Sequence, residues 1–106
     1  MGAKIKRTNR RKIVVSGVEK LHGTKFRIPP DRNEIVTFAI AAIITKGDIF
    51  IKDISREGLD EFLKILKKAG GAYEEKNNGI RFYYINGVSP TDAITSFYPG
   101  FMTDWQ

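Results

Sequence analysis

An aspartate near the end of the chain, Asp104, is the residue best suited to do chemistry. It follows Thr103 and a Phe-Tyr-Pro-Gly-Phe-Met segment whose proline and glycine indicate a loop. A carboxylate on an ordered loop is able to take a proton from a substrate hydroxyl group. On the residues alone, a general base and an ordinary loop carboxylate both remain open.

A second candidate site lies at Asp31 and Arg32, directly after the pair Pro29-Pro30. Asp31 is typical of a helix N-cap, and Glu34 three residues later completes a pattern like a capping box. Backbone N–H groups and the helix dipole favour an anion at such a place. A plain helix cap and an anion-binding helix start are both compatible with this pattern.

Other kinds of site find little support. His22 is the only histidine and the chain has no cysteine, so we expect no metal site, no thiol nucleophile and no disulfide. We also expect no cofactor. No apolar stretch reaches the length of a membrane span, and no signal-peptide pattern opens the chain. A cytoplasmic protein without a membrane partner is the simplest interpretation.

The net charge of +6 is a local feature of the first residues. Between residues 4 and 12 there are six lysines and arginines, and no acidic residue occurs before Glu19. Such a segment suits a phosphate-rich partner, and the aromatic residues of the tail could stack on bases. Together these two features favour a small nucleic-acid-binding α+β module. A solvated strand edge and a packed aromatic loop are the simpler alternatives. The aromatic residues of the tail are Phe97, Tyr98, Phe101 and Trp105.

Hydrophobic periodicity and turn residues predict an α/β (α+β) domain. The expected order from residue 25 is strand, helix, strand, helix, strand, strand. A short strand precedes it and another candidate follows it. The predicted strands cover 13–15, 25–28, 48–54, 72–76, 80–85 and 93–97, and the predicted helices cover 32–45 and 56–69.

The first predicted helix is apolar on every face, so we expect it to be buried all round. It is too short to cross a membrane. A chain of 106 residues has little material to cover such a helix completely. This mismatch predicts that neighbouring protein is missing and that the chain associates with itself.

Local signals make three finer predictions. Ser55 is expected to cap the second helix, and Asp60 is expected to pair with Lys64 on its wet face. Asn77-Asn78-Gly79 predicts a hairpin with a type I′ turn. A faint internal similarity also relates the first 17 residues to residues 70–87, at an offset near 69.

Taken together, the motifs resemble one family, the UDP-N-acetylglucosamine 1-carboxyvinyltransferases. That family typically reads G-V-E-x-L-x-G, P-D-R-I-E-x-G-T-F and P-x-F-P-T-D-M-Q, at similar separations. The matching segments here are residues 17–24, 30–38 and 98–106. The sequence departs from the pattern at Asn33, Val36, Met102 and Trp105, where the family has isoleucine, glycine, proline and methionine.

The resemblance implies an internal fragment of an inside-out α/β barrel with two halves built from βαβαββ repeats. Residues 1–29 would supply strands from the end of the preceding repeat in the other half. Residues 30–106 would form one repeat, with a substrate loop at its C-terminus. Asp31 and Arg32 would lie near the hinge, Thr103 and Asp104 would touch the sugar nucleotide, and Asp104 would be the base.

The implied reaction transfers enolpyruvyl from phosphoenolpyruvate to the 3′-hydroxyl of UDP-N-acetylglucosamine, the first committed step of peptidoglycan synthesis. The family's Lys-Asn pair, its cysteine-bearing loop and its phosphate-binding arginines have no counterpart here. Phosphoenolpyruvate needs such cations to bind, so it is a partner only of the complete enzyme. We therefore expect part of the sugar-nucleotide site, no nucleic-acid partner and no activity of the 106-residue chain alone.

Overall fold

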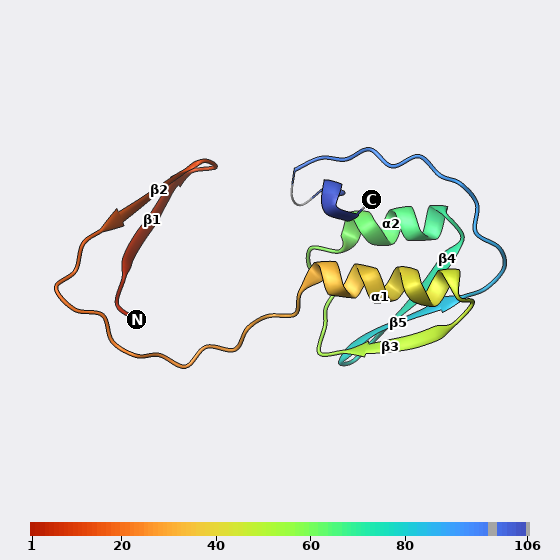
Figure 1. Ribbon diagram of the computed structural model, residues 1–106, viewed down its shortest axis with the longest axis horizontal. Helices are drawn as coiled ribbons and strands as arrows, with labels where there is room; N and C mark the ends of the chain where they lie inside the picture. Colours follow the sequence, from red (N-terminus) through yellow and green to blue (C-terminus); the bar gives the residue numbers. More distant parts are fainter. Residues whose placement is uncertain (98–99, 106) are drawn as a thin grey trace.

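Two bodies of different size make up the structure, a computed structural model that describes residues 1–97 and 100–105, with only the backbone of Asp104. An antiparallel hairpin forms the smaller body, and an extended segment over residues 17–31 joins it to the larger one (Figure 1). The hairpin contains β1 (Lys4–Asn9) and β2 (Lys12–Ser16). The larger body contains α1 (Arg32–Ile44), β3 (Asp48–Lys52), α2 (Asp60–Lys68), β4 (Gly71–Lys76), β5 (Gly79–Tyr84) and the 3-10 helix η1 (Thr103–Trp105).

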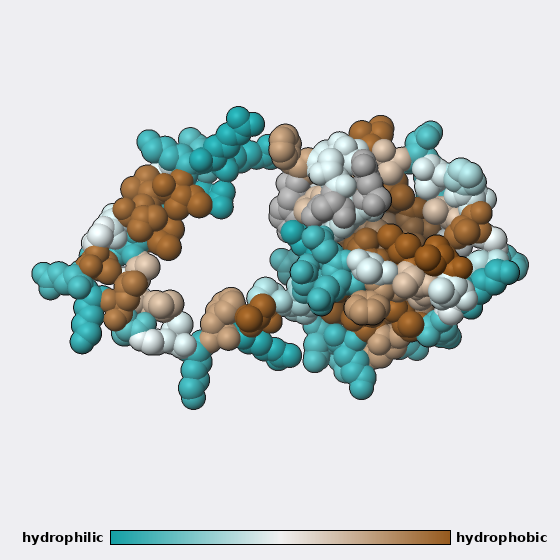
Figure 2. Space-filling model, in the orientation of Figure 1, coloured by the Kyte–Doolittle hydropathy of each residue, from teal (hydrophilic) through white to brown (hydrophobic). Residues whose placement is uncertain are grey.

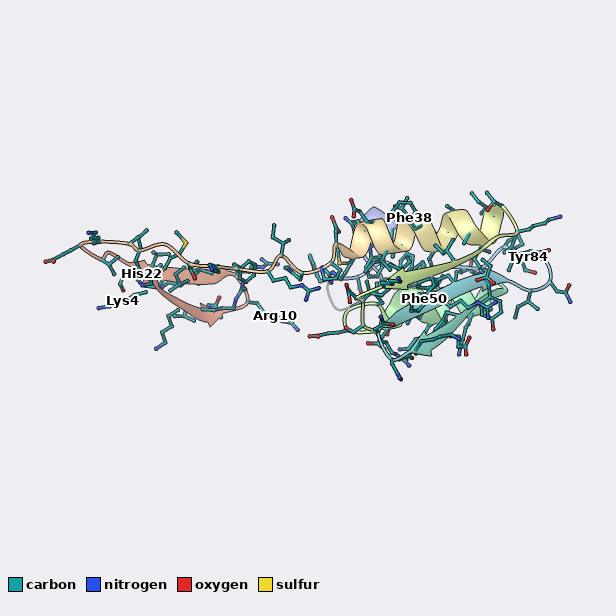
Figure 3. The ribbon with its side chains drawn as sticks, turned by 90° about the horizontal axis from the view of Figure 1, so that it is seen from below. Lys4, Arg10, His22, Phe38, Phe50 and Tyr84 are labelled. Atoms are coloured by element: carbon teal, nitrogen blue, oxygen red, sulfur yellow. The ribbon has the colours of Figure 1, made fainter. Side chains whose placement is uncertain are left out.

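The hairpin stands clear of the larger body. All its residues are exposed, and Figures 1 and 3 show it at the far end of the extended segment. The radius of gyration is 18.1 Å, compared with about 13 Å for a compact chain of 100 residues. The first 31 residues therefore contribute nothing to the core of the larger body.

The extended segment corrects one prediction, because the structure has no strand at residues 25–28. Phe26 and Ile28 are 78% and 82% exposed. An alternating run of four residues forms a strand only where a sheet edge lies beside it, and this run has no such neighbour among the described residues. Pro29 and Pro30 then remove two backbone donors that could have extended the pairing.

The core lies between a three-stranded antiparallel sheet and two helices. The strand order is β3-β5-β4, so β5 is central. Ile49 of β3 pairs with Phe82 of β5, and Ile51 pairs with Ile80, which places these four side chains on one face of the sheet. Phe82 and Ile80 are 0% and 1% exposed. The predicted mixed α/β class is confirmed, although the strand expected before α1 is absent.

Helix α1 begins where the sequence predicts. Asp31 is the N-cap residue, and its Oδ1 accepts a hydrogen bond of 2.8 Å from the backbone N–H of Asn33. Thirteen residues follow, five of them buried against the sheet and α2. No helix of the described residues is long and apolar enough to cross a membrane.

The expectation that α1 is buried all round is wrong for this chain. Phe38 and Ile44 are 58% and 68% exposed, and Ile40 is exposed as well. The sheet and α2 cover one side of the helix, which leaves these three side chains, here called the outer face of α1, in contact with solvent. Figure 2 shows apolar surface over this region and on the hairpin, and Figure 3 shows Phe38 on the outside of the helix.

Helix α2 begins later than predicted, at Asp60 rather than Arg56, and Ser55 does not cap it. Gly58 has a φ of +75°, a left-handed conformation that interrupts any helix through this position. The chain therefore makes a separate turn first, in which the N–H of Leu59 donates to the carbonyl of Arg56 at 2.9 Å.

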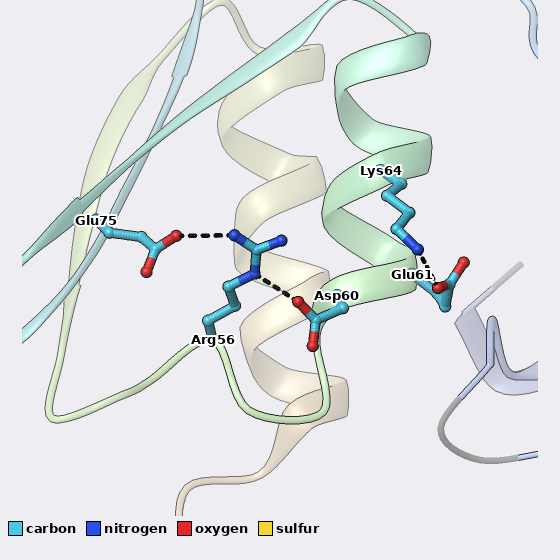
Figure 4. A network of polar contacts seen from close by, with 5 residues as sticks. All are labelled: Arg56, Asp60, Glu61, Lys64 and Glu75. Carbon is cyan, nitrogen blue, oxygen red and sulfur yellow. Dashed lines mark hydrogen bonds and ion pairs between the residues drawn. The ribbon is translucent and has the colours of Figure 1, made fainter.

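Ion pairs around α2 also differ from those predicted. Asp60 pairs with Arg56 at 2.5 Å, and Arg56 reaches across to Glu75 of β4 at 3.3 Å (Figure 4). Lys64 pairs with Glu61 at 2.5 Å instead of with Asp60. Arg56 thus links the start of α2 to the edge of the sheet.

The predicted β4–β5 hairpin is present, but its turn is not type I′. Lys76 pairs with Gly79, so Asn77 and Asn78 form a two-residue loop. A type I′ turn needs positive φ at both loop residues, whereas the described non-glycine residues with positive φ are Lys46 and Asp53. Gly79 is needed for space instead, because a Cβ there would lie 2.1 Å from the carbonyl oxygen of Ile51. The β1–β2 hairpin also has a two-residue turn.

Charged side chains occupy the sheet face that no helix covers. Arg81 donates to Asp48 at 2.9 Å and lies 3.6 Å from Glu74, so a cation on the central strand joins both edge strands. The hydrogen bond from Arg81 lowers the pKa of Asp48 below its ordinary value. The guanidinium also lies 4.7 Å from the ring centre of Tyr83. This network gives the uncovered face of the sheet a polar surface that suits contact with water.

Candidate functional site

The C-terminal loop is anchored by two buried aromatic side chains. Phe101 and Trp105 are 7% and 4% exposed. Their rings meet edge to face at 5.7 Å, and Trp105 meets Phe62 of α2 in the same way at 6.1 Å. For these two residues the packed-loop interpretation is correct, because buried rings present no surface on which a base could stack.

Thr103 lies between these anchors, on the 3-10 helix η1. Its side chain is exposed, and the turn is closed by a hydrogen bond of 3.1 Å from the N–H of Trp105 to the carbonyl of Met102. The backbone of Asp104 is part of the same turn, whereas its side chain lies outside the described residues. The role of Asp104 as a base therefore stays a prediction, and the structure places only its backbone, in η1.

The approach to this loop is irregular, and the strand predicted at 93–97 is absent. The N–H of Ser96 donates to the carbonyl of Phe101 at 2.8 Å, which closes the loop on itself instead of extending a sheet. A Cβ on Gly100 would lie 1.7 Å from Oγ of Ser96, so the closed loop leaves no room for a larger residue. Tyr98, Pro99 and Gln106, which belong to the matching motif, lie outside the described residues.

A hydrogen bond brings the two predicted parts of the site together. Nε1 of Trp105 donates to Oδ1 of Asn33 at 2.9 Å, across 72 positions in the sequence. Asn33 lies in the first turn of α1, next to Asp31 and Arg32. The loop that carries Thr103 is therefore held against the helix start (Figure 1). The sequence marks positions 33 and 105 as departures from the family pattern, but nothing local predicts that they touch.

An open hollow of about 570 Å³ lies on another side of the helix start. Its lining includes Pro30, Arg32, Asp53 and Glu57, and Thr103 is not among the lining residues. None of the described residues of the C-terminal loop lines this hollow. In the part of the chain that the structure describes, no three His, Asp or Glu side chains come together to hold a metal ion.

Comparison with known proteins decides the family. The family model described as EPSP synthase (3-phosphoshikimate 1-carboxyvinyltransferase) matches residues 1–106, the whole length of the chain. The chain belongs to the EPSP synthase family. The match includes the basic residues 4–12, so this segment lies within the matched family region.

Curated relatives within the EPSP synthase family are named UDP-N-acetylglucosamine 1-carboxyvinyltransferase. The protein from Afipia carboxidovorans is 41% identical over 100% of this chain. The one from Endomicrobium trichonymphae is 39% identical over 100% of the chain, and the one from Oleidesulfovibrio alaskensis is 42% identical over 89%. This chain spans about a quarter of the length of these relatives, 25%, 25% and 23% respectively.

Proposed function

We propose that this chain is part of an enzyme that transfers enolpyruvyl from phosphoenolpyruvate to the 3′-hydroxyl of UDP-N-acetylglucosamine, with release of phosphate. The observation that carries the proposal is the similarity of the whole chain to relatives that bear the name of this transferase. The reaction would serve peptidoglycan synthesis in the cytoplasm. Within the enzyme the chain would supply part of the sugar-nucleotide site.

Asp104 is the proposed base of the reaction. A sugar hydroxyl is a weak nucleophile, and a carboxylate within hydrogen-bond reach removes its proton as the new C–O bond forms. Thr103, exposed on the same turn, would bind the sugar nucleotide. The anchors Phe101 and Trp105 support this assignment, because buried residues on both sides restrict the movement of the turn between them.

Residues 1–29 are proposed to belong to the preceding repeat in the other half of the enzyme, and residues 30–106 to one repeat. The exposed hairpin and the extended segment after it support this division. Asp31 and Arg32 would then lie at the passage between the halves, where the cap formed by Asp31 sets the direction in which α1 leaves the hinge.

Phosphate release is the measurement that tests the proposed function. The longer protein that contains this chain is incubated with phosphoenolpyruvate and either UDP-N-acetylglucosamine or 3-phosphoshikimate. We expect release only with the sugar nucleotide. Release only with 3-phosphoshikimate would assign the chain to the other named activity of the family, and release with neither would overturn the proposal.

The 106-residue chain by itself should release no phosphate above background under the same conditions. Residues that act as a unit in catalysis give little when they are separated. The chain supplies the proposed base but no counterpart of the family's cysteine loop and arginine set. Turnover by the isolated chain would show that these missing groups are dispensable.

The isolated chain is also proposed to associate with itself. The outer face of α1 and the apolar residues of the hairpin, Ile5, Ile13 and Val15, are exposed together in one small molecule. Light scattering should show a mass that rises with concentration. Phe38→Ser should weaken the association, whereas the control Phe97→Ser, at a residue 87% exposed on the C-terminal segment, should not. A monomer at every concentration would contradict the proposal.

A further inference from the structure

Trp105 carries a polar group into a buried position. The residue is 4% exposed, and its indole N–H is satisfied by Oδ1 of Asn33 at 2.9 Å. A buried N–H that loses its partner destabilises the arrangement that buries it. Asn33 itself is exposed, so its amide is able to bond to water when the indole is absent. The contact is therefore asymmetric, because removing the asparagine side chain takes the acceptor from a buried N–H, whereas removing the indole leaves an amide that water can reach.

The position of Asn33 is itself fixed. Its backbone N–H donates to Asp31 at 2.8 Å, and its carbonyl oxygen accepts from the hydroxyl of Thr37 at 2.8 Å. Both bonds belong to the first turn of α1. An acceptor on this turn thus offers the loop a rigid point of attachment.

Trp105 transmits this attachment to the turn that precedes it. The backbone N–H of Trp105 donates to the carbonyl of Met102 and closes η1. Thr103 and the backbone of Asp104 therefore lie within a turn whose last residue is tied to α1. Phe101 ties the other end through its contact with the indole ring and its bond to Ser96. The bond to Asn33 joins the loop to the helix start.

Positions 33 and 105 both depart from the pattern of the family that the sequence resembles, in which isoleucine and methionine stand there. An isoleucine opposite Trp105 would leave the indole N–H without an acceptor. A methionine in place of the tryptophan has no side-chain N–H and therefore needs no acceptor. The two departures are consequently linked, since the tryptophan requires a polar partner at position 33.

We propose that Asn33 and Trp105 are positioning residues, whose hydrogen bond holds the Thr103–Asp104 turn at a fixed place relative to the first turn of α1. The catalytic part of this inference rests on the proposed function. The structural part rests only on the contact between the two side chains.

The structural part is tested on the 106-residue chain, in which Trp105 is the only tryptophan. With Asn33→Ile we expect a red-shifted indole emission and amide exchange at residues 102–105 that is roughly 2- to 10-fold faster, the effect of losing one hydrogen bond. The matched control is Ile44→Val, at the far end of α1 and 68% exposed, which should leave both signals unchanged. Equal spectra and exchange rates for Asn33→Ile and the control would overturn the proposal.

The catalytic part is tested on the longer enzyme with Asn33→Ile, Trp105→Met and both changes together. Asn33→Ile should lower kcat more than it raises KM for the sugar nucleotide, because a displaced base affects the transition state more than binding. In the Trp105→Met background, Asn33→Ile should cause no further loss of kcat. An equal loss in both backgrounds, or a change in KM alone, would contradict a positioning role.

The two proposals fail in distinguishable ways. If the wild-type enzyme releases no phosphate with UDP-N-acetylglucosamine, the proposed function is wrong, while the emission and exchange experiments still decide whether the contact holds the loop. If the enzyme is active and Asn33→Ile leaves kcat unchanged, the proposed function stands and the positioning role is wrong.

Discussion

Replacing Asp104 with asparagine in the complete enzyme should lower kcat by about 10²–10⁴-fold, the usual contribution of a general base. The amide has nearly the same shape as the carboxylate but does not accept the proton. Binding should change less, because the amide oxygen still accepts a hydrogen bond from the sugar hydroxyl. Steady-state kinetics with UDP-N-acetylglucosamine as the varied substrate separates the two effects.

Two substitutions of the same kind serve as comparisons for Asp104→Asn. Asp92→Asn changes an exposed carboxylate on the connecting segment and should leave kcat unchanged. Asp31→Asn keeps a good N-cap residue and should cost at most about 1 kcal/mol of stability. Near-normal turnover of Asp104→Asn would mean that Asp104 is a ligand contact or a loop anchor and that another group takes the proton.

Replacing Phe82 with alanine should destabilise the chain by about 3–5 kcal/mol, the range for a phenylalanine deleted from a core. Phe82 is 0% exposed on the central strand, where it packs under α1 and α2. Small domains are stable by about 5–15 kcal/mol in total. The variant should therefore lose a large part of its unfolding free energy, and urea denaturation followed by circular dichroism measures the change.

Phe26→Ala is the matched control, since it removes the same atoms from a side chain that is 78% exposed. Its effect on the unfolding free energy should stay within about 0.5 kcal/mol. A large effect of Phe26→Ala would mean that the extended segment packs against the larger body in solution. A small effect of Phe82→Ala would mean that the core between the sheet and the helices is not where most of the stability arises.

Local signals in the sequence predicted the parts of the fold that local interactions determine. The cap of α1 was predictable because Asp31 bonds to a residue two positions away. The β4–β5 hairpin was predictable because Asn77 and Asn78 favour a turn between two strand-like runs. In both places the residues that decide the structure are neighbours in the chain.

Features that depend on distant residues were missed or misplaced. The alternation at residues 25–28 does not reveal whether a sheet edge is available to pair with it. The demand for glycine at position 79 comes from the carbonyl of Ile51 on another strand, although the turn sequence suggested a conformational reason. The contact between Asn33 and Trp105 joins residues 72 positions apart, and no pattern of spacing predicts it.

Helix α1 is synthesised well before most of the residues that cover it. Residues 32–44 leave the ribosome well before β5 and the C-terminal loop that pack on them, which lie at residues 79–84 and 101–105. At about 5–20 residues per second, a helix that is apolar on every side spends several seconds without its cover. Even after the loop docks, Phe38 and Ile44 remain in water. A nascent chain of this sequence therefore offers chaperones a binding surface from the moment α1 emerges, and it keeps part of that surface after the 106 residues have folded.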